Sequence, residues 1–217
     1  MKLKKHIPAL LIFVVIIWGF IGLTFILDSK PVDVVKLKAI DGYGDSWEGT
    51  AFFVEDNLLV TAGHCVDGAE SITLVTVDGI EIEADNWYLE DTGIADIGII
   101  EVNTPTVEKR AAFDDAKVGE TVIAIGNPLC YFPVVTQGII SAVNVVDDFT
   151  YGKNVFITDC PIVPGNSGCP IIDKNNNVLG VCSWAYVCEG MNFCVRSEVV
   201  IAVLSKYKAI KYLEGLD

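Results

Sequence analysis

Short apolar runs broken by polar turns cover most of the chain from residue 34 onward. Residues Val34–Ile40 alternate apolar and polar side chains, which is typical of a strand with one buried face. Further runs follow in two series, separated by a connection at Asn103–Lys117. The first series is Thr50–Val54, Leu58–Thr61, Ser71–Val77, Ile80–Ala84 and Ile97–Val102, and the second is Thr121–Ile125, Val134–Val146, Val155–Thr158, Pro170–Ile172, Val178–Trp184 and Asn192–Val195. Short strands at this spacing, with Asp-Gly and Asn-rich turns between them, favour barrels or a sandwich over βαβ units.

The last part of the chain has the only helical pattern of this domain. In Ser197–Leu213, apolar residues such as Val200, Leu204 and Tyr207 recur every three or four positions, which predicts a helix with one face on the core. Ser197 is placed to cap its start. The patterns together predict an all-β domain of two barrels, within about residues 34–110 and 118–196, followed by a C-terminal helix at about 197–213.

The N-terminus has a different pattern. Ile7–Leu27 contains no charged residue over 21 positions, and as a helix at ~1.5 Å per residue it would reach about 31 Å, enough to cross a hydrocarbon core. A cleaved signal peptide is the alternative, but its apolar region is usually ~7–15 residues and ends at a small-x-small site, whereas Phe25–Asp28 is bulky. Lysines flank both ends of the stretch, so the positive-inside count is nearly tied.

We therefore predict a transmembrane signal anchor at residues 7–27, after a cytoplasmic tail at 1–6. A linker and lead-in strand at 28–45 would connect it to the main domain at 46–217, on the extracytoplasmic side. The net charge of the chain is −14, and the clustered Lys and Arg of a nucleic-acid surface are missing, so no nucleic-acid partner is expected. The oligomeric state has no signature in the sequence.

The cysteine pattern bears on metals and disulfides. The chain has seven cysteines, an odd number, and no CxxC pair, so neither a structural metal nor another cofactor is expected. Cys188 and Cys194 flank a short glycine-containing loop and are the pair expected to form a disulfide. This cysteine usage fits an oxidising exterior.

Three short strings carry candidate chemistry. They are Thr61–Cys65 (TAGHC), Ala95–Gly98 (ADIG) and Gly165–Pro170 (GNSGCP). They supply His64, Asp96 and Ser167 in that order. A serine hydroxyl is a weak nucleophile at its free pKa, and it needs an imidazole base that a third group orients. One string alone would be an ordinary turn, but the three together indicate a serine endopeptidase.

The sequence around each of these three residues supports a catalytic role. A lone histidine at a strand end is usually structural, but His64 is the only histidine outside the N-terminal tail. Asp96 lies between apolar residues, where a carboxylate needs a polar partner such as a histidine N–H. The segment Gly165–Gly168 has a glycine at each end. The backbone amides of Gly165, Asn166 and Ser167 are candidates for an oxyanion hole, those of Gly165 and Ser167 in particular.

These strings resemble the chymotrypsin (trypsin-like) serine proteases, and more closely the HtrA/Deg-type branch. The matching segments are Thr61–His64, Ala95–Ile97, Ala124–Pro128, Thr136–Ser141 and Thr158–Asp159, and the resemblance extends over roughly Val34–Leu213. It implies two six-stranded antiparallel β-barrels with the active site between them. It also implies His64 as general base, Asp96 as its partner, Ser167 as nucleophile, and the Gly165–Ser167 amides as oxyanion hole.

The chain departs from this family pattern at several positions. Asn166 stands where digestive members carry an acidic residue that binds a freed N-terminus, so that route of activation is not expected. Cys65 follows the histidine as in digestive enzymes, but Gly49–Phe52 offers no cysteine to pair with it. Cys169 replaces the usual glycine two residues after the serine and is expected to crowd the strand there. No PDZ-like domain is expected after the helix.

By resemblance, Ser183, Trp184 and Ala185 form one wall of the primary substrate pocket, and Pro161 lies near its base. None of them is charged, so small or medium aliphatic substrate side chains are favoured. The resulting hypothesis is a membrane-anchored serine endopeptidase that acts on polypeptides. Two alternatives remain: a membrane-tethered pseudoprotease that only binds, and an enzyme gated by oxidation of Cys65 beside His64.

Overall fold

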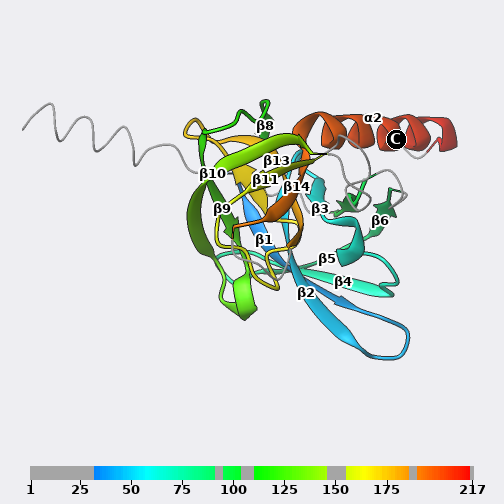
Figure 1. Cartoon of the computed structure of the whole chain (residues 1–217). Helices are drawn as coiled ribbons and strands as arrows, with labels where there is room; N and C mark the ends of the chain where they lie inside the picture. Colours follow the sequence, from blue (N-terminus) through cyan, green and yellow to red (C-terminus); the bar gives the residue numbers. More distant parts are fainter. Residues whose placement is uncertain (1–31, 91–94, 104–109, 146–154, 186–189, 216–217) are drawn as a thin grey trace, which may run out of the picture. The chain divides into compact units, whose positions relative to one another are not determined.

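The computed structural model describes residues 32–90, 95–103, 110–145, 155–185 and 190–215 (Figure 1). The predicted tail at 1–6, the anchor at 7–27 and the first part of the linker, residues 28–31, lie outside these residues. Within the described ranges, no helix has the length and apolar character needed to cross a membrane.

Seven antiparallel strands form the first sheet, in the order β5-β4-β1-β2-β3-β7-β6. Their bounds are β1 Val34–Ile40, β2 Ser46–Phe53, β3 Leu58–Thr61, β4 Ser71–Val75, β5 Glu81–Glu83, β6 Asn86–Leu89 and β7 Gly98–Glu101. The strand β6, which follows no apolar alternation, was not predicted. The first barrel was expected to have six strands, and this count is wrong because β6 adds to the edge of β7.

The second sheet has the order β12-β9-β10-β11-β14-β13-β8. Its strands are β8 Ala112–Phe113, β9 Thr121–Gly126, β10 Val134–Val145, β11 Val155–Thr158, β12 Pro170–Ile172, β13 Asn177–Ala185 and β14 Asn192–Arg196. Because β12 also pairs with β13, six of these strands close into the expected barrel. The seventh, β8, lies in the predicted connection and pairs in parallel with β13.

The helix α2, Ser197–Glu214, follows β14 as predicted. Its N-cap is Arg196, and the hydroxyl of Ser197 instead donates to the carbonyl of Asp114 at 2.7 Å, so the predicted capping role of Ser197 is wrong. This bond joins the start of the helix to the connection between the sheets.

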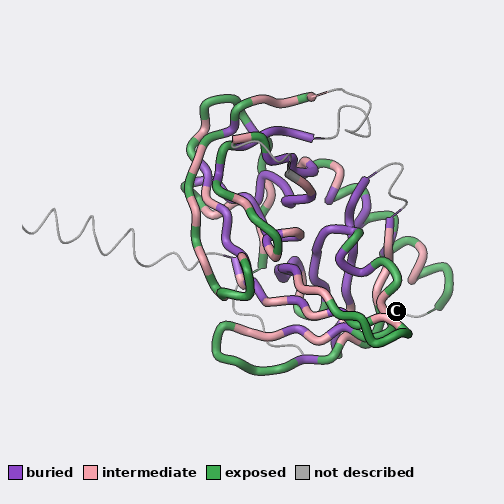
Figure 2. Tube along the Cα trace, turned by 60° about the horizontal axis from the view of Figure 1, so that its bottom comes forward, coloured by how far each residue is buried: buried purple, intermediate pink, exposed green. Residues whose placement is uncertain are grey.

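Each sheet has its own apolar interior, and a third cluster joins them. Leu37, Leu59 and Ile100 lie inside the first sheet, and Ile140, Phe156 and Leu179 lie inside the second. The joining cluster contains Phe52 and Ile99 from the first sheet, Ile172 and Val181 from the second, and Val200 and Val203 from α2. Figure 2 shows the buried residues along the inner strands and the exposed ones on the outer turns. Because burial of apolar surface drives folding, the joining cluster fixes one sheet against the other.

Candidate active site

His64 and Asp96 are brought together by two adjacent strands. His64 lies in a short 3₁₀ turn, Gly63–Cys65, just after β3, and Asp96 lies just before β7. Because β3 and β7 are antiparallel, with Thr61 opposite Gly98, the end of one meets the start of the other. The backbone N–H of His64 donates to Asp96 Oδ1 at 2.8 Å, and His64 Nδ1 lies 2.8 Å from Asp96 Oδ2. The carboxylate thus orients both the ring and the backbone of His64.

A third group contacts the same carboxylate. The hydroxyl of Ser183, on β13 of the second sheet, donates to Asp96 Oδ2. Asp96 is 6% exposed, and Ser183 is 2% exposed. A buried carboxylate is tolerated only when polar partners replace the lost water, and Asp96 has three such bonds. The sequence placed Ser183 only in the substrate pocket, because nothing local indicates a bond across 87 residues.

The contact between His64 and Asp96 shifts the pKa values of both side chains. Burial by itself lowers the pKa of His64, but the hydrogen bonds and charge interactions with Asp96 and Cys65 together outweigh it, so the pKa of His64 is raised above its ordinary value of 6.5. Burial by itself raises the pKa of Asp96, but the hydrogen bonds with His64 and Ser183 and the charge interaction with His64 together outweigh it, so the pKa of Asp96 is lowered below 3.8. Asp96 is therefore ionised at neutral pH, and it stabilises a proton on His64.

Ser167 lies in a tight turn before β12. The glycines on either side of it, Gly165 and Gly168, have φ angles of +97° and +86°, a conformation that other residues rarely adopt. A Cβ atom on Gly165 would lie 2.1 Å from the carbonyl oxygen of Asn127. The hydroxyl of Ser167 is directed at the carbonyl of Ser183, 3.5 Å away. Hydrogen bonds between a nucleophile and its base are often long without substrate and tighten when it binds.

The amides near Ser167 differ in availability. The N–H of Asn166 donates to the carbonyl of Val163 at 3.1 Å, so it is not available to a substrate. Within the described part of the chain, the N–H groups of Gly165 and Ser167 have no hydrogen-bond acceptor. Of the three predicted oxyanion donors, these two amides are the ones available to a substrate.

Thr50 is a residue that the sequence did not single out, and it ties the turn to the first sheet. Its hydroxyl donates to the carbonyl of Gly165 at 2.9 Å, and its N–H donates to the carbonyl of Ser167 at 2.8 Å. Thr50 is fully buried on β2. Both bonds hold carbonyls of the turn away from the open amides.

His64 and Ser167 line one cavity of about 440 Å³. The other lining residues are Trp47, Glu48, Cys65, Asp67, Pro164 and Gly165. Glu48 is held by Lys36 Nζ at 3.0 Å and by Asn127 Nδ2 at 3.0 Å. Ser167, His64 and Gly165 therefore all border the same cavity.

Among the described residues predicted for the substrate pocket, none lines this cavity. Pro161 is exposed, and its carbonyl accepts a hydrogen bond from Thr136 at 3.0 Å. The Trp184 ring stacks on Phe193 at 5.3 Å between centroids and an angle of 5°. Ser183 and Ala185 lie with Trp184 on β13, and the side chain of Ala185 lies outside the described residues.

All six described cysteines are free thiols, which corrects the predicted disulfide. Cys194 lies opposite Cys182 on neighbouring strands inside the second barrel, and its predicted partner Cys188 lies outside the described residues. Cys160 and Cys169 pack into the same cluster, so the barrel interior takes up the Cys169 side chain. Burial raises the pKa of the Cys194 thiol, which disfavours its reactive thiolate form.

Cys65 is buried beside the catalytic candidates. Its Sγ contacts the carbonyl of Ser167 at 3.7 Å. A Cβ atom on Gly49 would lie 2.8 Å from this sulfur, so the close approach of β2 to the 3₁₀ turn uses the space of a glycine. The residue opposite Cys65 is therefore not a cysteine, as the sequence indicated.

The chain is similar to known serine proteases. Residues 49–181 match the trypsin-like peptidase domain. The chain is 33% identical over 201 residues to the serine protease Do-like HtrA of Bacillus subtilis, covering 84% of this chain and 44% of the relative. It is 32% identical over 170 residues to a probable periplasmic serine endoprotease, DegP-like, of Halomonas elongata, covering 74% of this chain and 35% of the relative. The chain thus spans less than half the length of these two relatives.

A solved structure shows the same fold. The Rv3671c protease of M. tuberculosis, in its active form, superposes with a TM-score of 0.73 at 24% identity, covering 83% of each chain. At this identity the likeness concerns the fold.

Proposed function

Because this chain belongs to the trypsin-like peptidases, with HtrA/Deg serine proteases among its relatives, we propose that it is a serine endopeptidase with Ser167 as its nucleophile. The observation that carries the proposal is the hydrogen-bonded pair of His64 and Asp96 on the cavity that Ser167 lines. An imidazole that is oriented by a carboxylate and lies near a serine is the arrangement that activates the serine hydroxyl as a nucleophile.

The proposed reaction uses these groups in two steps. Ser167 Oγ attacks the peptide carbonyl carbon while His64 Nε2 takes the hydroxyl proton, and the N–H groups of Gly165 and Ser167 bind the oxyanion. His64 then returns the proton to the leaving amine as the C–N bond breaks. Water, deprotonated by His64, hydrolyses the acyl-enzyme and restores Ser167. Asp96 stays ionised throughout and stabilises the imidazolium.

Labelling with a fluorophosphonate probe tests the proposal directly, because only an activated serine reacts. We expect the chain to be labelled and to cleave an unfolded protein, and the Ser167→Ala variant to do neither. Ser205→Ala is the matched control, because Ser205 lies on the surface of α2 and bonds only within the helix. A folded but unlabelled chain would instead identify a pseudoprotease that binds peptides without cleaving them.

We extend the proposal to cleavage after small or aliphatic residues. The support is the uncharged character of Pro161, Ser183 and Trp184, which gives a basic or acidic substrate side chain no counter-ion. Matched peptides that differ only at the residue before the cleaved bond test this. A higher kcat/KM for Ala or Val than for Arg and Asp is expected, and a preference for Arg would contradict it.

We also propose that residues 7–27 anchor the chain in a membrane with the peptidase domain outside. The support is the uncharged stretch itself. Protease accessibility of the full chain in sealed membrane vesicles tests it. The domain should be digested from the extracytoplasmic face only, and it should stay with the membrane after an alkaline wash. Release by that wash would refute the anchor.

A further inference from the structure

Glu90 is a buried carboxylate outside the catalytic pair. It directly follows β6, and 2% of its surface is exposed. Lys206 Nζ donates to its two oxygens at 2.9 and 3.0 Å, and the hydroxyl of Tyr88 donates at 3.1 Å. The hydrogen bond with Glu90 also raises the pKa of Lys206. Such a site needs a cation because a buried carboxylate without one is costly.

The cation comes from the other end of the chain. Lys206 belongs to α2, which follows the last strand of the second sheet and reaches the edge of the first sheet near β6 (Figure 1). The next residue, Tyr207, packs its ring against that of Tyr88, with centroids 5.6 Å apart. Two adjacent helix residues therefore hold the end of β6.

The end of β6 is joined to the segment that carries Asp96. The N–H of Glu90 donates to the carbonyl of Ile97 at 3.0 Å, and Leu89 pairs with Gly98. Asp96 precedes Ile97 directly, and its carboxylate must meet His64 and Ser183 at once. A displacement of Glu90 would therefore also displace Ile97 and, with it, the neighbouring Asp96.

We propose that Lys206 is a positioning residue for catalysis: through Glu90 it fixes the segment at residues 95–97 so that Asp96 meets His64. The proposal rests on the proposed peptidase function. It assigns α2 a part in the active site, although no residue of the helix lines the catalytic cavity.

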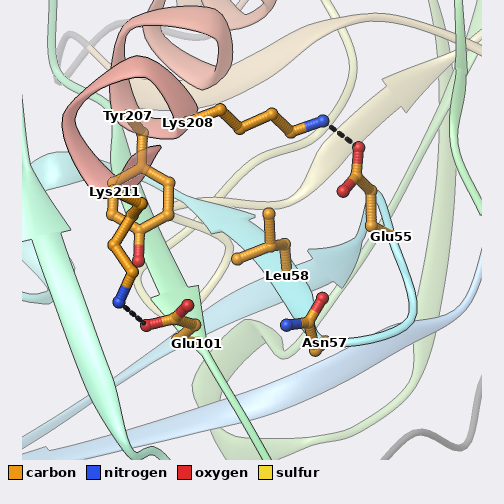
Figure 3. A pocket seen from close by; sticks show the side chains of 7 residues that line it. All are labelled: Glu55, Asn57, Leu58, Glu101, Tyr207, Lys208 and Lys211. Atoms are coloured by element: carbon orange, nitrogen blue, oxygen red, sulfur yellow. Dashed lines mark hydrogen bonds and ion pairs between the residues drawn. The ribbon is translucent and has the colours of Figure 1, made fainter. Parts of the chain in front are cut away.

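The same helix supplies a matched control. Lys208 pairs with Glu55, and Lys211 pairs with Glu101, around a separate cavity of about 260 Å³ (Figure 3). The side chains of Lys206 and Lys208 are 53% and 50% exposed. Glu55 lies in the turn between β2 and β3, at the opposite end of β3 from His64. Loss of the Lys208 pair removes a similar surface cation without touching the Asp96 segment.

The experiment compares Lys206→Met, Lys206→Arg and Lys208→Met in the full chain. Because a misplacement of about 1 Å can cost 10²-fold, we expect Lys206→Met to lower kcat about ten- to hundredfold with KM unchanged. Lys206→Arg keeps the charge and should keep most of kcat, and Lys208→Met should equal the wild type. The proposal is overturned if Lys206→Met keeps its kcat within twofold, or if Lys208→Met loses as much.

A double variant separates positioning from stability. Lys206→Met leaves Glu90 buried without its cation, which is destabilising by itself, whereas an apolar pair at such a site is often tolerated. We expect Glu90→Leu with Lys206→Met to restore the melting temperature but not kcat. Recovery of kcat together with stability would show that the ion pair serves the fold alone.

A readout independent of turnover keeps the two proposals apart. The low-field NMR resonance of the His64 Nδ1 proton reports its hydrogen bond with Asp96 even in a chain that cleaves nothing. It should shift or broaden in Lys206→Met and stay unchanged in Lys208→Met. An unlabelled wild-type chain would refute the peptidase function, whereas an unchanged resonance in Lys206→Met would refute the positioning role.

Discussion

At the scale of single residues, the Asp96 carboxylate sets the pH range in which His64 can act as a base in the proposed mechanism. Its hydrogen bond raises the pKa of His64, and catalysis requires the neutral imidazole, so kcat/KM should rise as the pH increases through that raised pKa. The same bond stabilises the fold most fully below about pH 6.5, the ordinary pKa of histidine. That contribution is lost as the pH rises through the raised pKa of the folded state.

Asp96→Asn tests this balance. The variant removes the charge that favours the imidazolium, so the acid limb of kcat/KM should move to lower pH. The plateau should fall about 10⁴-fold, as expected when the carboxylate of a triad is replaced. Kinetics between pH 5 and 10 measure both effects. Asp173→Asn is the control, because Asp173 is also buried but bonds only its own hairpin turn. An acid limb that does not move would contradict the assigned role of Asp96.

The sequence indicated the three proposed catalytic residues, but not the residues that form hydrogen bonds to their surroundings. His64, Asp96 and Ser167 stand out because each lies in a short string with restricted chemistry. Ser183 and Thr50 do not, because their bonds to Asp96 and to Gly165 cross 87 and 115 positions of the chain. Such contacts depend on how the two sheets pack, and local patterns carry no information about that packing.

At the scale of elements, the turn that carries Ser167 depends on a strand of the other sheet. Thr50 on β2 fixes two of its carbonyls, and the positive φ of Gly165 leaves that residue's N–H open. The arrangement requires that no side chain stand at position 165, where the carbonyl of Asn127 fills the space.

Gly165→Ala should therefore impair catalysis more than folding. The new methyl group would be forced against Asn127 and displace the oxyanion amides, and loss of one such donor costs roughly 10²–10³ in rate. Gly79→Ala is the control: its φ is also positive, at +80°, but no atom lies within 4 Å of the added carbon. Gly79→Ala should lose about 1–2 kcal/mol of stability from the backbone strain, and Gly165→Ala should lose more, because the backbone at Asn127 must also move. Equal activity in the two variants would refute the role of the Gly165 amide.

Element boundaries were predictable where burial is continuous. The bounds of β3, β11 and β12 agree with the apolar runs Leu58–Thr61, Val155–Thr158 and Pro170–Ile172, because both faces of these strands are buried. The strand β6 was missed because its residues are exposed or only partly buried, and β8 because two residues form it by pairing with β13. Such edge strands are defined by a neighbour's backbone.

At the scale of the whole molecule, the charge of −14 should act on substrates before they bind. Asp67 and Glu48 line the cavity at His64 and Ser167, so the electrostatic potential there is negative as well. Lys36 offsets part of the charge of Glu48. A field of one sign raises the encounter rate of oppositely charged ligands, by about 10- to 10³-fold in strong cases. Cationic segments of unfolded proteins should therefore arrive faster than acidic ones.

Salt dependence of kcat/KM tests this steering. Two peptides with the same aliphatic residue before the cleaved bond, one with distant lysines and one with distant glutamines, should differ severalfold at low ionic strength. The Debye length falls from about 10 Å at 0.1 M to about 3 Å at 1 M, so the advantage of the lysine peptide should vanish at high salt while the glutamine peptide changes little. Asp67→Asn should reduce the advantage at low salt without changing the rate for the neutral peptide. A lysine advantage that persists in 1 M salt would point to a direct contact in the cavity and would contradict steering by the whole molecule.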